Sequence, residues 1–354
     1  MSSAGPYSYF NYYQAINEPI VKDIVKSYID HEAIFTRFPI ETVRSLKRKS
    51  KRIIGNLPTP TPMDIGEEPP VPFVQDYEDY EEAPYLLRDN FDLDELFMMD
   101  ENYVQGEPLE RQIESYIEGR TFYINNCFIN NSHTDGPIRE RKMIVGIKYR
   151  LATTQFGNSP TASVQSTANL SDAQFSVSNA IKVERDLERL FDQMGNHNGN
   201  GMVVMGNPQL LRQLNAVVKS AGYSGGFKTT ADAFDREVIK FKGAEIVSVG
   251  YQAPAANGAQ NTPVIDSAQD LNGWSPGDSQ YQGNANATTL YVVWGGRNKF
   301  STWQMTDPML RKVMPISGTR KNRVMFDQTL GLWNPDIRAL GRIYGIVVNG
   351  PAGD

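Results

Sequence analysis

The chain has 354 residues, of which 40% are hydrophobic and 21% charged, and its formal net charge is −6. At roughly 150 residues per domain, this length predicts two or three domains. No run of about 18 apolar residues occurs, and the N-terminal sequence lacks a basic segment followed by an apolar one, so we expect neither membrane spanning nor secretion. The acidic balance argues against a surface that wraps nucleic acid throughout, although it permits a local basic patch.

The sequence gives no support for metal or cofactor chemistry. Cys127 is the only cysteine and cannot form an internal disulfide, and the three histidines are too far apart for zinc-ligand spacing. Neither of the glycine-rich nucleotide-binding fingerprints occurs. The carboxylates Asp89, Asp92, Asp94 and Glu95 lack the calcium-loop pattern with its glycine and distal glutamate. We therefore expect no cofactor and no metal site.

The first strong feature along the chain is a basic run between residues 44 and 52 that contains no acidic residue. Three interpretations are open: contact with nucleic acid phosphates, pairing with an acidic segment of a neighbouring chain, or a solvated helix face. Because the sequence also contains a strongly acidic segment, charge complementarity favours the first two. The run has no interleaved aromatic residues, so any nucleic acid contact is expected to be nonspecific. Its basic residues are Arg44, Lys47, Arg48, Lys49, Lys51 and Arg52.

The charge then reverses in a segment that we call the tongue, residues 58–106. Between residues 60 and 120 the sequence has 18 carboxylates and 3 arginines, a net charge of −15. Closely spaced prolines predict polyproline-like stretches at the start of the tongue. Beyond them we expect one short helical turn capped by Asp92, and a hairpin that is either disordered or held against another chain. We interpret five acidic residues as an intersubunit surface: Asp76, Glu78, Asp79, Glu81 and Glu82.

The elements after the tongue have clearer periodicity. Pro108 at a first helical position, followed by apolar residues at steps of three and four, predicts a long amphipathic helix over 108–128. Alternating apolar residues predict a strand over 141–151, and the polar stretch 153–171 is typical of a loop. A second helix is expected over 178–194, with a glycine directly after it as its stop.

A strand-helix-strand unit is expected next, which predicts a mixed sheet covered by helices. A buried strand over 202–205 leads to Asn207 as a helix cap, with Pro208 as the first helical residue, and a strand over 244–249 returns. The remaining expected elements are a surface loop over 254–287, a hairpin of strands 288–294 and 299–303, and strands over 323–332 and 339–348.

One motif matches a catalytic pattern. The segment Gly222-Tyr223-Ser224-Gly225-Gly226 has the form of the nucleophile elbow in hydrolases. An elbow requires a strand before the serine and a histidine after it, whereas here a helix is expected before it and the last histidine is His197. We therefore interpret the segment as a glycine loop after a helix, and we predict no catalytic residue.

Five segments resemble the major capsid proteins of tailed bacteriophages, whose fold is shared with encapsulins and with the floor of the herpesvirus capsid. Residues 82–86 are similar to the end of an extended loop, and residues 108–128 to a spine helix. Residues 144–151 are similar to the strand that follows that helix, and residues 288–295 to a late axial-domain strand. Residues 326–346 resemble the C-terminal signature of these shells. The order of the five segments across roughly two thirds of the chain carries the resemblance.

The resemblance implies an α+β major capsid fold. The implied regions are an N-terminal arm (1–57), an extended loop (58–106), a spine helix with a peripheral domain (107–195), an axial domain (196–318), a peripheral-domain strand (319–334) and a C-terminal axial-domain strand (335–354). We expect the extended loop to lie across a neighbouring subunit.

The implied function is mechanical rather than enzymatic. The chain would form hexamers and pentamers of an icosahedral phage head around double-stranded DNA. Its partners would be further copies of itself, scaffolding, portal and decoration proteins, and nonspecifically bound DNA, with no membrane. It would be located in the virion capsid after assembly in the cytoplasm of the bacterial host. Two alternatives are an encapsulin-like compartment that encloses a cargo enzyme and, less favoured, a soluble hydrolase that uses Ser224.

Overall fold

The structure is a computed structural model of the chain. It describes residues 13–14, 19–31, 33–45, 47–53, 65, 77–94, 108–131, 144–152, 162–171, 176–220, 223, 225–231, 237–252, 262–269, 271, 282, 286–296, 298–305, 309–316 and 320–348. The helices and strands in chain order are α2 (Pro19–Asp30), η1 (Ile34–Arg37), β1 (Ile40–Thr42), β2 (Arg48–Ile53), β3 (Tyr77–Glu82), β4 (Tyr85–Asp94), α4 (Pro108–Asn130), α5 (Ile147–Ala152), β5 (Ser163–Gln165), α6 (Val177–Met194), β6 (Met202–Gly206), α7 (Pro208–Val218), β7 (Phe227–Ala231), β8 (Glu237–Phe241), β9 (Ala244–Ser248), β10 (Ala287–Trp294), β11 (Ser301–Gln304), β12 (Met309–Pro315), β13 (Lys321–Trp333), η6 (Ile337–Ala339) and β14 (Leu340–Val347).

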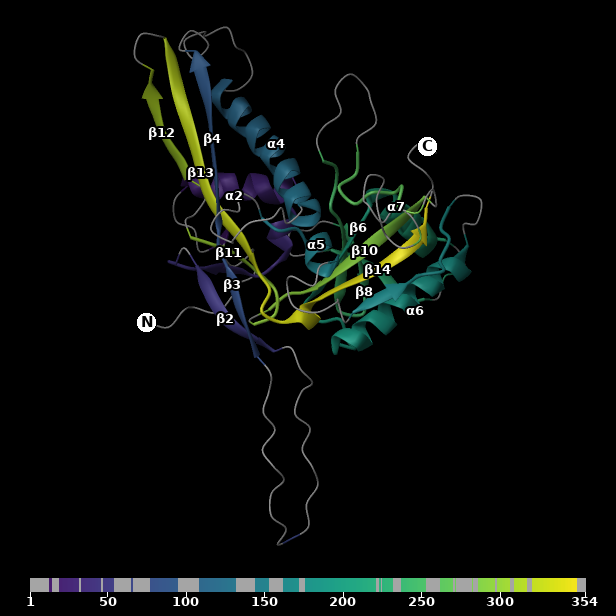
Figure 1. Cartoon of the computed structure of the whole chain (residues 1–354). Helices are drawn as coiled ribbons and strands as arrows, with labels where there is room; N and C mark the ends of the chain where they lie inside the picture. Colours follow the sequence, from purple (N-terminus) through teal and green to yellow (C-terminus); the bar gives the residue numbers. More distant parts are fainter. Residues whose placement is uncertain are drawn as a thin grey trace.

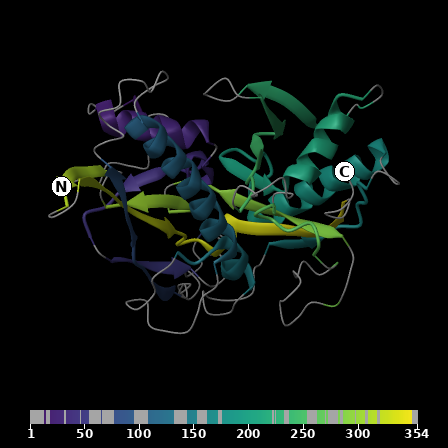
Figure 2. The same cartoon turned by 90° about the horizontal axis from the view of Figure 1, so that it is seen from above.

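These elements form two lobes that lie side by side (Figures 1 and 2). One lobe contains a seven-stranded sheet in the order β5-β14-β10-β6-β9-β8-β7, together with α6 and α7. The other contains α2, α4 and a five-stranded sheet, in which β1-β11-β13-β12 form the path and β4 pairs with β13. The strands β2 and β3 form a separate two-stranded sheet.

The strand-helix-strand unit is confirmed in the first lobe. The side chain of Asn207 accepts a hydrogen bond from the Gln209 amide at 2.8 Å, and Pro208 is the first residue of α7. Since β6 and β9 pair in parallel, α7 lies in the crossover between them, and β10 pairs antiparallel with β6 on its other side. The strands β7 and β8, which the sequence did not predict, extend this sheet beyond β9.

Helix α6 packs on the same sheet through a continuous apolar face. Ser176 caps its start, and Gly195 ends it with a left-handed φ of 76°, a conformation that glycine adopts without strain. Burying each large aliphatic side chain of this face contributes roughly 1.5–3 kcal/mol. The face consists of Ala180, Val183, Leu187, Leu190, Phe191 and Met194, all buried.

The predicted long helix is confirmed as α4, and it lies alongside a long antiparallel unit of β4, β13 and β12 that we call the blade (Figure 1). Charged residues that face each other across β4 and β13 form bidentate ion pairs. Arg88 Nε lies 2.7 Å from Asp327 Oδ1, and Arg323 Nε lies 2.7 Å from Asp92 Oδ1. On α4, the buried Arg120 donates a hydrogen bond to the Leu87 carbonyl in β4 at 2.9 Å. These bonds align the blade with the helix.

A buried amide on α4 makes hydrogen bonds toward both lobes, which also share an apolar core. Asn125 Oδ1 accepts a hydrogen bond from the Ile34 amide of η1 at 2.8 Å. Its Nδ2 donates to the carbonyl of Val249, directly after β9, at 3.2 Å. Because both partners are buried backbone groups, replacing this amide would leave polar atoms unsatisfied in the core. The contact therefore holds η1 and the end of β9 in place.

The strand predicted over 141–151 is wrong for its described part, because residues 147–152 form helix α5. Ile147 and Leu151 are four residues apart and both buried, so the alternating pattern also satisfies helical spacing. A Cβ at Gly146 would lie 2.5 Å from the Ile129 carbonyl oxygen. This close approach to the end of α4 turns the chain into α5 instead of continuing it as a strand.

Three further expectations are corrected. The strands β10 and β11 do not form a hairpin, since β11 pairs with β1 and β13 in the other sheet. Asp92 does not cap a helical turn, because it lies in β4 opposite Arg323. The predicted loop 153–171 contains the short strand β5, which pairs with β14. The predicted polyproline stretches lie outside the described residues.

Candidate functional site

The basic run forms strand β2, which pairs with the acidic strand β3 of the tongue within one chain. Strands β2 and β3 are antiparallel, and the register places basic residues of β2 opposite acidic residues of β3. The helix-face interpretation of the basic run is therefore wrong. The opposed pairs are Arg48 and Glu82, Lys49 and Glu81, Lys51 and Asp79, and Arg52 and Glu78.

One side of this strand pair is exposed and carries lysines. Lys49 Nζ lies 3.1 Å from Glu81, and Lys47 also contacts Glu81. Lys51 Nζ lies 3.9 Å from Asp79. Hydrogen bonds from Lys47 and Lys49 hold the pKa of Glu81 below its usual range. The side chains of Lys49 and Lys51 remain 73% and 71% exposed, so these ion pairs add little stability.

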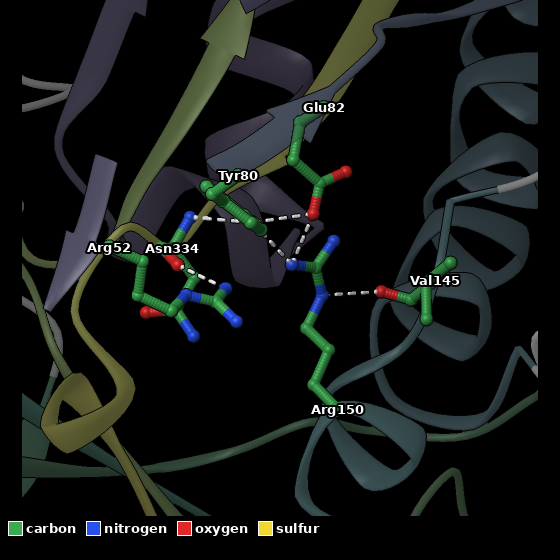
Figure 3. A network of polar contacts seen from close by, with 6 residues as sticks. All are labelled: Arg52, Tyr80, Glu82, Val145, Arg150 and Asn334. Carbon is green, nitrogen blue, oxygen red and sulfur yellow. Dashed lines mark hydrogen bonds and ion pairs between the residues drawn. The ribbon is translucent and has the colours of Figure 1, made fainter. Parts of the chain in front are cut away.

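The other side of the strand pair is buried around an ion pair that links it to α5 (Figure 3). Arg150 Nη1 lies 2.6 Å from Glu82 Oε1, and the two side chains are only 1% and 2% exposed. Arg150 Nε also donates to the Val145 carbonyl at 2.9 Å. Tyr80 Oη donates to Glu82 Oε1 at 2.6 Å, and Arg150 Nη1 donates to Tyr80 Oη at 3.1 Å. The carboxylate is thus held by two donors from two different elements.

The same network reaches the segment after β13. Arg52 Nη2 donates to the Asn334 carbonyl at 2.8 Å, and the Asn334 amide donates to Tyr80 Oη at 3.3 Å. The Arg52 guanidinium lies 3.9 Å from the centre of the Tyr80 ring, which itself packs against Trp333 at 4.9 Å. Three segments that are far apart in sequence therefore meet at Tyr80, as Figure 3 shows.

Burial and charge act in opposite directions on this network. Burial alone would lower the pKa of Arg150, but the Glu82 carboxylate and Tyr80 outweigh it and raise that pKa above the usual arginine value. Burial, together with the neighbouring Glu82, raises the pKa of Tyr80. Arg150 and Tyr80 therefore keep their protons throughout the physiological range. The network acts as a fixed clamp on the strand pair. We call the pair of strands β2 and β3 the tongue root, because residues 54–76 connect them.

The structure separates the predicted site residues into groups. Lys47, Lys49, Lys51, Glu81 and Asp79 lie on the exposed side of the tongue root, whereas Arg52 and Glu82 are buried. Arg48 lies between them, contacting Glu41 at 2.7 Å and the Trp333 ring. Arg44 is exposed in the segment before β2. Glu78 is half-buried opposite Arg52, and Asp76 lies outside the described residues.

Sequence reasoning missed the part played by Arg150. The buried Ile147 and Leu151 place Arg150 on the core-facing side of α5, but the alternating pattern of the segment predicts a strand, in which a spacing of four residues does not define a buried face. Glu82 could not be distinguished from its acidic neighbours, because nothing in the sequence identifies which carboxylate faces inward. Trp333 and Tyr80, as large aromatic residues beside charged runs, were the available signal.

The glycine loop has a structural explanation. Glu184 of α6 accepts a hydrogen bond from the Gly226 amide at 3.0 Å and contacts the hydroxyl of Tyr223. A Cβ at Gly226 would lie 2.7 Å from the Phe241 ring. The loop thus packs tightly against α6 at the start of β7, and Ser224 lies outside the described residues. In the described part of the chain, no group of three or more metal-ligating side chains occurs, and no helix is long and apolar enough to cross a membrane.

Comparison with solved structures identifies the fold. No protein-family model and no curated protein matches the chain. Among solved structures, the holo-SrpI encapsulin complex from Synechococcus elongatus aligns over 96% of this chain and 95% of its own, with a TM-score of 0.54 and 11% identity. The capsid of a native GTA particle aligns over 90% and 91%, with a TM-score of 0.52 and 10% identity.

The chain has the major capsid fold. The fold expected from the sequence resemblance, that of tailed-phage capsid proteins and encapsulins, is therefore confirmed. The alignments cover nearly the whole chain, so the major capsid fold includes both lobes and not only the sheet with α6 and α7. The boundaries of the six expected regions stay predictions.

Proposed function

We propose that this chain is the major capsid protein of a tailed bacteriophage, whose copies assemble into an icosahedral head around double-stranded DNA. The observation that carries the proposal is the major capsid fold over nearly the whole chain. Two solved structures that share it are a capsid and an encapsulin complex, both of which are assemblies. The function is mechanical and needs no catalytic residue.

Features of the chain itself support assembly from many copies. The clamp at the tongue root holds the two strands that residues 54–76, a proline-rich and acidic segment of the sequence, connect. Such a segment has too little apolar surface to fold alone, so burial on neighbouring subunits is the physical means of ordering it. We propose hexamers and pentamers as the building units, with scaffolding, portal and decoration proteins as further partners. Assembly would take place in the bacterial cytoplasm and end in the virion.

Double-stranded DNA is the proposed content of the shell. The side chains of Lys49 and Lys51 are the most exposed cations of the tongue root, and their ammonium groups can contact phosphates. Contacts of this kind weaken with salt. They are also independent of the nucleic acid sequence, as packaging of a whole genome requires. Arg52, in contrast, is committed to the Asn334 carbonyl and the Tyr80 ring.

A second candidate is an encapsulin-like compartment around a cargo enzyme. A specific observation favours it: each basic residue of β2 lies opposite a carboxylate of β3, which reduces the positive charge available to DNA. The alignment with the encapsulin complex also covers 96% of this chain.

The decisive experiment is expression of the full chain with and without a coexpressed scaffold, followed by size-exclusion chromatography and negative-stain microscopy. Closed shells or capsomer-sized rings are expected. Particles treated with nuclease and still rich in nucleic acid would support the phage head, whereas closed shells that form without scaffold and contain no nucleic acid would support the compartment. A monomer of the chain under all conditions would contradict both.

A matched pair of variants tests the DNA contact. Lys49→Gln with Lys51→Gln should release packaged DNA at lower salt than the wild type. The control is Lys219→Gln with Lys242→Gln, since these exposed lysines also pair with carboxylates but lie in the lobe with the seven-stranded sheet. Equal salt sensitivity in the two variants would contradict a role of the tongue root in DNA retention.

A further inference from the structure

Two asparagine-glycine pairs follow each other in the segment that connects α6 to β6, Asn198-Gly199 and Asn200-Gly201. In such a pair the next backbone nitrogen can attack the side-chain amide of the asparagine, because glycine has no Cβ to obstruct the approach. Both asparagines are exposed. By sequence the two pairs are equivalent sites for this reaction, and the structure distinguishes them. Three further pairs, at residues 257, 272 and 349, lie outside the described residues.

The first pair is held on both sides of its peptide group. The Gly199 amide donates a hydrogen bond to the Asn196 carbonyl at 3.1 Å, and the Asn198 carbonyl accepts one from the Gly243 amide at 2.9 Å. Gly199 is also buried, and a Cβ at its position would lie 2.8 Å from the Phe191 ring. The Gly199 nitrogen can turn toward the Asn198 side chain only if this peptide group leaves both hydrogen bonds.

The second pair is open at the attacking nitrogen. Asn200 and Gly201 are the central residues of a turn that is closed by a hydrogen bond from the Met202 amide to the Gly199 carbonyl at 3.0 Å. Gly201 is exposed and has the left-handed φ of 71° that the third position of a type II turn requires. Within the described residues, neither the Gly201 amide nor the Asn200 side chain makes a hydrogen bond. The nitrogen and the side-chain amide are therefore both free to meet.

One hydrogen bond restrains the second pair. Asn196 Nδ2 donates to the Asn200 carbonyl at 2.9 Å. Because this carbonyl belongs to the same peptide group as the Gly201 nitrogen, the bond limits the rotation of that nitrogen toward the Asn200 side chain. The bond is exposed, so water competes for both of its partners. It therefore slows the attack without preventing it.

We propose that Asn200 is a site of spontaneous deamidation in the folded chain and that Asn196 controls its rate. The Gly201 nitrogen attacks Asn200 Cγ and loses its proton to solvent, while the bond between Cγ and Nδ2 breaks and ammonia leaves. The product is a five-membered succinimide. Water then opens the ring at one of its two carbonyls, which gives aspartate or isoaspartate. The reaction needs only water, and it is independent of whether the chain forms a shell.

The modification would act at the start of a central strand of the seven-stranded sheet. The Gly201 carbonyl accepts a hydrogen bond from the Gly295 amide, directly after β10, at 2.9 Å, and Met202 begins β6. Isoaspartate adds one carbon to the backbone of the turn, so the hydrogen bonds of Gly201 and Met202 cannot both keep their geometry. We therefore expect modified chains to open first where β6 begins.

Peptide mapping by mass spectrometry tests the selectivity. The full chain is incubated in mildly alkaline water labelled with heavy oxygen, so that the label separates deamidation during incubation from deamidation during digestion. Fragmentation of the tryptic peptide 190–212, which contains both pairs, locates the modified residue. In the folded chain Asn200 should convert at least about fivefold faster than Asn198, the factor for one additional hydrogen bond. In urea, both should convert at comparable rates.

The variant Asn196→Ala tests the restraint. It removes the donor to the Asn200 carbonyl, so the conversion of Asn200 should become about two- to tenfold faster. The rate at Asn198 should not change, because the backbone carbonyl that holds the Gly199 amide remains. The matched control is Gln193→Ala, which removes an exposed amide near the end of α6 and should leave both rates unchanged.

The outcomes separate the two parts of the proposal. Deamidation of the folded chain at Asn200 is overturned if Asn198 converts equally fast, or if Asn200 stays intact while the chain in urea reacts. The role of Asn196 is overturned if its alanine variant behaves like Gln193→Ala, or if it accelerates both pairs to the same extent.

Discussion

The sheet with α6 and α7 and the tongue root are held in place by different forces. The sheet packs through apolar side chains, and the face of α6 that covers it contains no charge. The tongue root has few apolar contacts and depends on Tyr80, Trp333 and the ion pair of Arg150 with Glu82. Apolar burial tolerates small shifts of position, whereas a buried ion pair with fixed hydrogen bonds defines one geometry. The sheet is therefore stabilised by the amount of apolar surface that it buries, whereas the tongue root is held in one orientation by its buried ion pair.

The largest effect is expected from breaking the buried ion pair. Glu82→Leu leaves Arg150 charged and unpaired in the interior, which costs about 3–5 kcal/mol of unfolding free energy. The double variant with Arg150→Met should recover most of this loss, because the remaining side chains are apolar and of similar size. Urea unfolding of the unassembled chain, followed by tryptophan fluorescence, measures both.

The control for this experiment is Glu188→Leu, which removes an exposed ion pair with Lys242 and should change the unfolding free energy by less than about 1 kcal/mol. A double variant no more stable than Glu82→Leu alone would show that the two charges are not coupled.

A comparable loss is expected in the sheet lobe from an apolar truncation. Leu187→Ala on α6 removes a fully buried side chain and should cost about 2–5 kcal/mol, depending on how far the cavity collapses. Unlike the ion-pair variant, it cannot be rescued by a second substitution that removes a charge. Chemical denaturation at two salt concentrations measures the effect, and a loss that changes with salt would contradict the apolar origin.

A smaller, pH-dependent effect is expected at Asp336, which accepts a hydrogen bond from the Arg338 amide at 3.0 Å and contacts Lys299. Burial raises the pKa of Asp336, but Arg338 and Lys299 outweigh it, so the pKa lies below its usual value. A lowered folded-state pKa stabilises the fold above the unfolded value, about 3.9, and this contribution is lost as pH falls through the folded value.

Asp336→Asn should therefore destabilise the chain by about 1–2 kcal/mol at pH 7, with the difference from wild type shrinking below about pH 4. Melting temperatures measured from pH 7 to pH 3 test this. A difference that stays constant over that range would mean that the charge of Asp336 is not responsible.

The smallest effect is expected on α4. Gly119 lies within the helix, is exposed, and has nothing within 4 Å of the position of an added Cβ. Gly119→Ala should raise the unfolding free energy of the unassembled chain by about 0.5–1 kcal/mol, because glycine loses more backbone freedom in a helix. A lowered melting temperature would contradict the open space at this position.

The elements with strong local signals were predictable from the sequence. Pro108 and the apolar periodicity after it predicted α4, and Asn207 with Pro208 predicted the start of α7. These features act within one or two turns of helix, so no distant residue is needed to interpret them. The C-terminal strands β13 and β14 were also predicted, close to their observed bounds.

Pairing between distant segments was not predictable in the same way. The sequence shows that a basic run and an acidic segment are complementary, but complementarity does not state whether they meet within one chain or between two. The register of β2 and β3 decides that they meet within the chain. Likewise, β10 and β11 are adjacent in sequence but belong to different sheets, because β11 finds β1 and β13 as partners.

By itself, the sequence therefore determined the helices α4, α6 and α7, the strands β10, β13 and β14, the charge blocks and the resemblance to a major capsid protein. Only the tertiary structure decided which charges are buried and which are exposed. The physical reason is that burial depends on contacts between residues as distant as Arg52, Glu82, Arg150 and Asn334. No local pattern encodes such contacts, since a carboxylate at the surface and one in the core have the same sequence signature.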